Sequence, residues 1–160
     1  MRRIFVVAAL AALIISCSQQ APKVEHLRVE GTALMNESGD TVELKGMSFG
    51  WNVLWPRFYN AQAVKHVVKD WDAELVRAAI GVEIDDDECQ VENYLKNPEF
   101  GKQCACTIVD AAIENGVYVL VDWHAHGLHT EAAVEFFTYM ATKYKGVSNV
   151  IYEIWNEPSY

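Results

Sequence analysis

Four apolar segments recur along the chain at intervals of roughly thirty to forty residues, and this spacing constrains the fold more than any other feature. They span residues 44–49, 75–82, 117–122 and 150–155. Each is a nearly continuous apolar run, which is typical of parallel strands covered on both faces. The interval matches one strand–helix–strand unit, so the sequence predicts an α/β fold with a parallel sheet.

The segments between these strands show helical periodicity. Behind Asn60, which is placed to cap a helix, apolar residues recur at i, i+3, i+4 and i+7. They are Val64, Val67, Val68 and Trp71. A second helix is expected to end at Asn115 and Gly116, a pair suited to a left-handed C-cap. A third helix is expected to follow Thr130.

A β-hairpin is predicted ahead of the first strand. Residues 27–29 and 42–44 flank the stretch 36–40, whose Asn, Glu, Ser, Gly and Asp are typical of a turn. No low-complexity segment or interdomain linker follows. The domain is therefore expected to extend over residues 25–160.

Length and composition limit both the domain count and the partners. The chain has 160 residues, enough for one ordinary globular domain, and 51% of them are hydrophobic. Its formal net charge is −9. This acidic balance argues against a nucleic-acid partner, and a neutral or weakly charged substrate fits it better.

The first residues have the pattern of an export signal. Two arginines precede an apolar run over residues 4–15, and twelve apolar residues are too few to span a bilayer as a stable anchor. Residues 14–17, Ile-Ile-Ser-Cys, resemble a bacterial lipobox. We predict a signal peptide over residues 1–16, a lipidated Cys17 and a polar tether over residues 17–24. The protein is thus expected to be exported, either anchored to a membrane or secreted, and a plain signal peptide or an uncleaved anchor stays open.

Three further cysteines follow the export signal. In an oxidising compartment Cys89 could pair with Cys104 or Cys106, whereas the last two point to different faces of a helix and are poor partners for each other. Three free thiols are the alternative. A zinc site is the weaker interpretation, because no fourth ligand completes the usual spacing.

An open doubly wound sheet and a closed (β/α)8 barrel share this order of elements. Residues 46–51 do not match the glycine-rich phosphate loop of many doubly wound folds. Polar and aromatic residues instead collect at the strand ends, where barrel enzymes keep their active sites. They are Trp51, Asn52 and Trp55, then Arg77 and Glu83, then Asp122, Trp123 and His124, and finally Asn156 and Glu157. A whole barrel needs about 250 residues, so we predict a (β/α)8 TIM barrel truncated to roughly its first four units.

Four motifs, in order and at matching intervals, resemble the N-terminal half of a glycoside hydrolase family 5 catalytic domain. The similarity is to the endo-β-1,4-glucanase (cellulase) branch in particular. The motifs lie at residues 44–48, 76–79, 121–124 and 151–158. The resemblance implies a retaining enzyme that hydrolyses a β-linked polysaccharide without a cofactor or metal. It also implies that the nucleophile is a second Glu on a strand later than any in this sequence, so residues 1–160 alone are expected to be inactive. Unpaired edges of the truncated sheet are expected to make them poorly soluble.

The resemblance assigns roles to individual residues of this sequence. Glu157 would be the general acid/base, and Asn156 would contact the sugar 2-hydroxyl. Arg77 would orient the nucleophile, and His124 would line the cleft. A glycosidic oxygen leaves poorly until it is protonated, which is why a carboxylic acid must stand beside it. We expect nearby tryptophans, Trp123 among them, to shield Glu157 and favour its protonated form.

Two of these residues have structural alternatives. An arginine within an apolar strand must be paired, and the partner of Arg77 is either the nucleophile or a structural carboxylate such as Asp122. His124 is either a cleft residue or a hydrogen-bonded residue of the rim. The acidic stretch over residues 83–88 is most simply a solvated loop, although it lies on the same rim.

Flat aromatic side chains suit the apolar faces of glucose rings. We predict that Trp51, Trp55 and Trp123 bind substrate, and that Trp71 and Trp155 belong to the core. The alternative for Trp51 and Trp55 is a structural role in which they only cover the top of the barrel. The sequence lacks two features of many family 5 cellulases, a His soon after Gly-Met-Ser and an aromatic residue soon after the strand-two Arg. The details of the glucan subsites, and the choice among cellulose, mixed-linkage glucan, mannan and xylan, therefore stay open. The competing hypothesis is a surface lipoprotein that binds glycans through these tryptophans without hydrolysing them.

Overall fold

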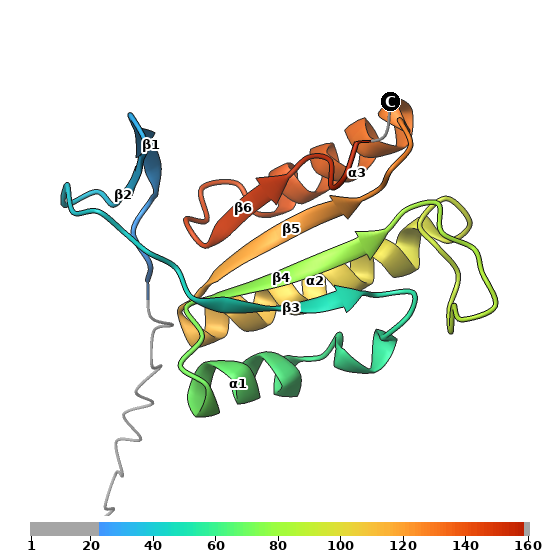
Figure 1. Cartoon of the computed structure of the whole chain (residues 1–160), viewed down its shortest axis with the longest axis horizontal. Coiled ribbons are helices and arrows are strands. Elements are labelled where there is room, and N and C mark those ends of the chain that lie inside the picture. The colour runs from blue at the N-terminus through green and yellow to red at the C-terminus, as the bar shows by residue number, and fades with distance from the viewer. Residues whose placement is uncertain (1–22, 159–160) are drawn as a thin grey trace, which may run out of the picture.

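A parallel four-stranded sheet forms the centre of the computed structural model, which describes residues 23–158. The strands β3 (Gly46–Trp51), β4 (Leu75–Gly81), β5 (Tyr118–His124) and β6 (Val150–Glu153) lie side by side in the order of the sequence (Figure 1). Every neighbouring pair is parallel. The predicted parallel α/β sheet is confirmed.

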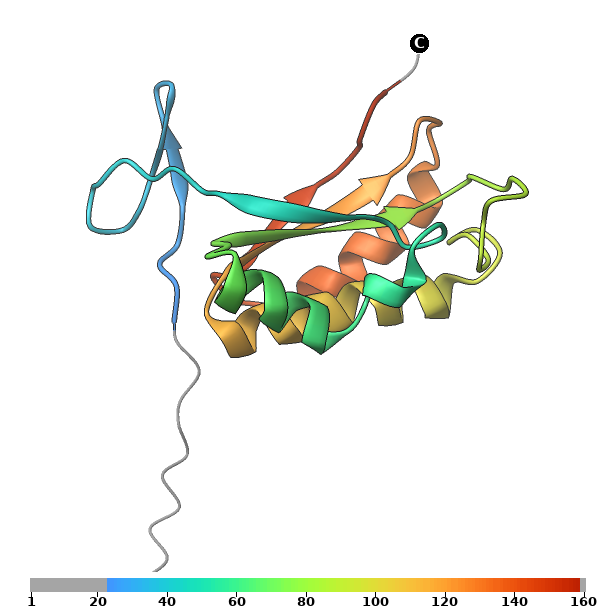
Figure 2. The ribbon, with the colours of Figure 1, turned by 60° about the horizontal axis from the view of Figure 1, so that its bottom comes forward.

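The helices cover one face of this sheet. They are α1 (Ala61–Asp70), α2 (Pro98–Asn115) and α3 (Thr130–Lys143), and a short 3-10 helix, η1 (Pro56–Phe58), precedes α1. Figure 2 shows all three α-helices on the same side of the strands. Alternate strand residues and the inner helix faces form the core on that side. The remaining strand side chains lie on the opposite face of the sheet.

Local signals fix the helix ends as the sequence predicts. The Asn60 side chain accepts a hydrogen bond from the backbone N–H of Ala63 at 2.9 Å, which satisfies a free amide at the start of α1. Gly116 ends α2 with φ 68°, in the left-handed region where glycine has no steric cost. Both predicted caps are confirmed.

The hairpin lies closer to the N-terminus than predicted. Strand β1 (Arg28–Glu30) pairs with β2 (Ala33–Met35) around Gly31, whose φ of 61° permits a tight two-residue turn. Residues 42–44 form no strand, and the expected turn at 36–40 is closed by a single bridge between Met35 and Thr41. The first part of the prediction is right, and the partner strand was assigned to the wrong side of the turn.

Trp71 is the clearest departure from the predicted core. The helical geometry of α1 ends before it, and its backbone φ of −120° turns the side chain out of the apolar stripe. Its side chain is 58% exposed and lies edge-on against His66. Trp155, by contrast, is half-buried and packs against the core as expected.

The three cysteines in the described residues are free thiols, so the disulfide considered for Cys89 is not formed. Cys104 and Cys106 are buried on α2, and burial raises the pKa of the Cys104 thiol to about 11. The predicted signal peptide over residues 1–16 and Cys17 lie outside the described residues. Within residues 23–158, no helix has both the length and the apolar character needed to cross a bilayer.

Candidate active site

The helix-free face of the sheet carries a row of charged side chains. Side chains alternate along a strand, so Val121 and Trp123 on β5 point towards the helices, while Asp122 and His124 point to the opposite face. The strand register aligns Asp122 with Glu153 of β6. Parallel pairing thus brings residues far apart in the sequence to one edge of the sheet.

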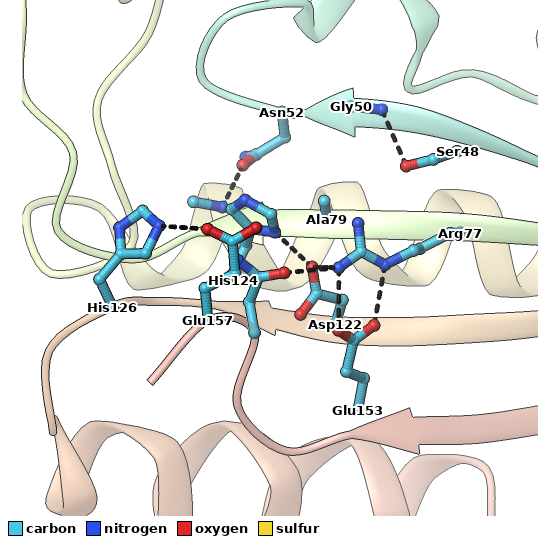
Figure 3. A network of polar contacts seen from close by, with 12 residues as sticks. Ser48, Gly50, Asn52, Arg77, Ala79, Asp122, His124, His126, Glu153 and Glu157 are labelled. Atoms are coloured by element: carbon cyan, nitrogen blue, oxygen red, sulfur yellow. Dashed lines mark hydrogen bonds and ion pairs between the residues drawn. The ribbon is translucent and has the colours of Figure 1, made fainter. Parts of the chain in front are cut away.

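Arg77 is the centre of this row. Its guanidinium contacts Glu153 at two points, Nε to Oε2 at 2.8 Å and Nη2 to Oε1 at 2.9 Å, and Nη2 also lies 2.7 Å from Oδ2 of Asp122 (Figure 3). The hydrogen bond to Glu153 raises the pKa of Arg77. One cation therefore compensates two carboxylates. The structural partner considered for Arg77, Asp122, is confirmed, and Glu153 joins it.

His124 is held by the same network. Its Nδ1 lies 2.5 Å from Oδ2 of Asp122, the oxygen that Arg77 also contacts. Asp122 is fully buried, and burial raises its pKa while the hydrogen bond from His124 acts in the opposite direction. An ionised Asp122 selects the tautomer with its proton on Nδ1, which fixes the orientation of the ring.

Asn156 and Glu157 follow β6 at the carboxyl edge of the sheet. The Asn156 side chain accepts a hydrogen bond from Nη2 of Arg77 at 3.0 Å, and its backbone N–H donates to the carbonyl of Trp123 at 3.3 Å. Glu157 comes next and lies beside His126, with 3.6 Å between Oε2 and Nε2. Its side chain is 82% exposed, so the expected shielding by tryptophans is not present among the described residues.

Two of the three tryptophans predicted to bind substrate are accessible. The Trp51 ring lies edge-on against His124, with 4.3 Å between ring centroids, and forms a wall beside the charged row. Trp55 is exposed and packs over Gly50, where an added Cβ would meet its ring.

Trp123 does not fit the predicted role. Its side chain is only 2% exposed and packs between Tyr94 and Phe136, on the helix-covered face. The physical reason is the alternation of β5, which turns Trp123 away from the face that carries Asp122 and His124. Trp123 is a core residue here, and the prediction that it binds substrate is corrected.

The change Trp123→Phe should therefore lower the free energy of unfolding by about 1–3 kcal/mol, because it leaves a cavity in the core. The matched change Trp71→Phe, at an exposed position, should alter it by less than about 0.5 kcal/mol. Urea denaturation followed by circular dichroism measures both. Equal effects of the two changes would contradict the core assignment.

Sequence reasoning overlooked Glu153, placed Glu83 on the rim without a defined role, and considered His126 only as a possible subsite residue. An available signal for Glu153 was an isolated carboxylate in an otherwise apolar strand, which needs a cationic partner such as Arg77. Glu83 was assigned to a solvated loop, yet it accepts backbone hydrogen bonds from His126 and Gly127. No local sequence pattern predicts these hydrogen bonds, because the donors lie forty-three and forty-four residues from Glu83 along the chain.

A parallel sheet with helices on one face and a charged network at the carboxyl ends of its strands defines an α/β protein with an enzyme-like site. The cellulase profile of glycosyl hydrolase family 5 matches residues 35–160, and the chain belongs to this family. Arg77, His124, Asn156 and Glu157 all lie within the matched region.

Individual relatives agree with this assignment. Endoglucanase Z of Dickeya dadantii is 36% identical over 165 aligned residues, which cover 98% of this chain and 37% of that protein. A solved structure from Cytophaga hutchinsonii superposes with a TM-score of 0.77 at 41% identity, over 83% of this chain and 42% of that one. The catalytic domain of Thermobifida fusca endoglucanase Cel5A gives a TM-score of 0.71 at 29% identity, over 82% of this chain and 43% of that domain. The chain thus spans less than half the length of each.

Proposed function

We propose that this chain forms the acid/base part of an endo-acting β-1,4-glucanase that retains configuration by double displacement. The observation that carries the proposal is the position of Asn156 and Glu157 beside the Arg77 network at the carboxyl edge of the sheet. Named relatives support the substrate class, because they are endoglucanases and one Cel5A structure contains cellotetraose. On this proposal, the chain supplies the first four units of a (β/α)8 barrel, and later units supply the nucleophile.

Each residue has a chemical task in this proposal. Glu157 protonates the leaving oxygen, and after the glycosyl-enzyme has formed it removes a proton from the attacking water. The nucleophile attacks from about 5 Å away, as in other retaining glycosidases. Arg77 keeps the carboxylates of this face charge-compensated and presents Asn156 towards the sugar 2-hydroxyl. Trp51 and Trp55 offer faces to glucose rings, and His124 lines the cleft.

Release of reducing sugar by the full-length protein tests this function. Carboxymethylcellulose and mixed-linkage β-glucan should be cleaved faster than xylan or mannan, and viscosity should fall early because internal bonds are cut. Polarimetry on cellotetraose should detect the β-anomer first. An α-anomer as first product would contradict retention, and binding to glucan without cleavage would favour the glycan-binding alternative.

We also propose that the protein is exported and anchored through a lipid on Cys17, because the apolar run before it ends in a lipobox-like sequence. The change Cys17→Ala should move the protein from the membrane fraction to the soluble fraction of fractionated cells. Cys89→Ala is the matched control and should leave the distribution unchanged. Identical partitioning of the Cys17→Ala protein and the unchanged protein would contradict the anchor.

A further inference from the structure

We infer that Glu83 and His126 form a positioning pair that holds the acid/base Glu157 in place, an inference that rests on the function proposed above. Glu83 follows β4 and His126 follows β5, and the register that pairs Gly81 with His124 brings the two residues opposite each other. Their side chains meet beside Glu157 at the carboxyl edge of the sheet.

The backbone of the loop after β5 anchors the Glu83 carboxylate. Its Oε1 accepts hydrogen bonds from the backbone N–H groups of His126 at 2.7 Å and Gly127 at 3.0 Å. Two donors on one oxygen fix the carboxylate and the start of the loop after β5 together. The carboxylate therefore sets the backbone from which the His126 side chain projects.

The second oxygen of Glu83 faces another histidine. Oε2 lies 3.6 Å from Nε2 of His129, and both atoms are buried without a hydrogen-bond partner in the described structure. The His129 ring is the polar group that faces this carboxylate oxygen. Glu83 is thus held between the loop backbone and the rings of His126 and His129, rather than exposed like the acidic residues that follow it.

The His126 ring lies between two carboxylates. Its Nδ1 is 3.9 Å from Oε1 of Glu83, and its Nε2 is 3.6 Å from Oε2 of Glu157. Figure 3 shows the ring turned towards Glu157. Trp51 lies close on another side, with 5.8 Å between ring centroids, and limits the positions the imidazole can take. These contacts connect the exposed carboxylate of Glu157 to the anchored Glu83.

The chemistry of this arrangement suits a residue that works first as an acid. Glu83 favours the tautomer of His126 with its proton on Nδ1, so the lone pair of Nε2 faces Glu157. The 3.6 Å separation is just beyond hydrogen-bond distance, and a small rotation of the exposed Glu157 side chain would let its protonated form donate to Nε2 before substrate binds. After Glu157 has given its proton to the leaving oxygen, the same contact keeps the carboxylate in place for the deprotonation of water. His126 acts through Glu157 and is a positioning residue.

Leaving-group dependence separates this role from a general loss of structure. In the full-length protein, His126→Ala should lower kcat/KM on cellotetraose roughly tenfold, because the carboxylate is no longer held at the leaving oxygen. On 2,4-dinitrophenyl β-cellobioside, whose leaving group needs no proton, kcat/KM should change less than about twofold. Glu83→Gln keeps an acceptor for the two backbone amides. It should also lower kcat/KM on cellotetraose more than on the activated substrate, but by a smaller factor than His126→Ala. His66→Ala removes an exposed histidine paired with Asp70 and should leave kcat/KM unchanged on both substrates.

A double variant completes the test. In the Glu157→Ala background, His126→Ala should cause no further loss on cellotetraose, since both changes remove one function. Independent, multiplied losses, or equal losses on the two substrates, would overturn the positioning role while leaving the proposed function standing. Failure of the unsubstituted protein to cleave cellotetraose would instead overturn the proposed function itself.

Discussion

Replacing Glu157 with alanine in the full-length protein is expected to lower kcat/KM on cellotetraose by roughly 10²–10⁴-fold. Cleavage of an unactivated glycosidic bond requires a proton on the departing oxygen, and Glu157 is the carboxyl group that follows β6 at the edge where the Arg77 network lies. Steady-state kinetics with purified protein measures the loss. Glu131→Ala, which removes an exposed glutamate from the first turn of α3, is the matched control and should have no effect.

The same variant should still react with an activated substrate. Formation of the glycosyl-enzyme from 2,4-dinitrophenyl β-cellobioside needs no acid, so kcat/KM on that substrate should be preserved. Its kcat should fall, because water is no longer deprotonated in the second step. Azide needs no base and should restore turnover, with a β-cellobiosyl azide as product. If activated and unactivated substrates are lost alike and azide does not help, Glu157 is the nucleophile or a structural residue.

Arg77→Met is expected to cost about 3 kcal/mol of unfolding free energy and most of the activity. The change leaves Asp122 fully buried without its cation, and breaking a buried pair by removing one partner is strongly destabilising. The value lies at the low end for buried pairs because Glu153 keeps partial contact with solvent. Arg57→Met, at an exposed arginine that lies over the Phe58 ring, is the matched control and should cost well under 1 kcal/mol.

The decrease in unfolding free energy caused by Arg77→Met should depend on pH. Burial already raises the pKa of Asp122, and Arg77 opposes that shift, so the pKa rises further in the variant. The folded variant then binds its proton more tightly than the unfolded chain, and its stability increases as pH falls through the raised pKa towards about 4. Urea denaturation at several pH values should show the largest difference from the unchanged protein near neutrality and a smaller one in acid. A difference that grows in acid would contradict this account.

Local sequence signals predicted the elements that local chemistry controls. The cap at Asn60 and the left-handed Gly116 are set by backbone groups within a few residues, so both were visible in the sequence. Hydrophobic runs of strand length likewise gave the order of β3 to β6, and parallel pairing then placed their carboxyl ends together. Arg77, His124 and Asn156 could therefore be assigned to one edge in advance.

The remaining features depend on contacts that no short segment encodes. Trp123 follows a polar residue at a strand end, and only the phase of the β5 alternation decides that it faces the helices. The partner of Glu153 lies on another strand, seventy-six residues away along the chain, and that of Glu83 lies in the loop after β5, forty-three residues away. Trp71 satisfies helical spacing but comes after the last helical residue.

The two-sided character of β5 has a consequence for how this family can diverge. Substitutions at Val119, Val121 and Trp123 act on how much of the protein is folded, whereas those at His124 act mainly on the helix-free face. Substitutions at the buried, paired Asp122 act on both. On the function proposed above, a gene copy released from selection for hydrolysis but still required to fold would keep the core residues of β5 and vary at His124. The residue at position 124 in such a copy would then show whether selection for hydrolysis has been retained.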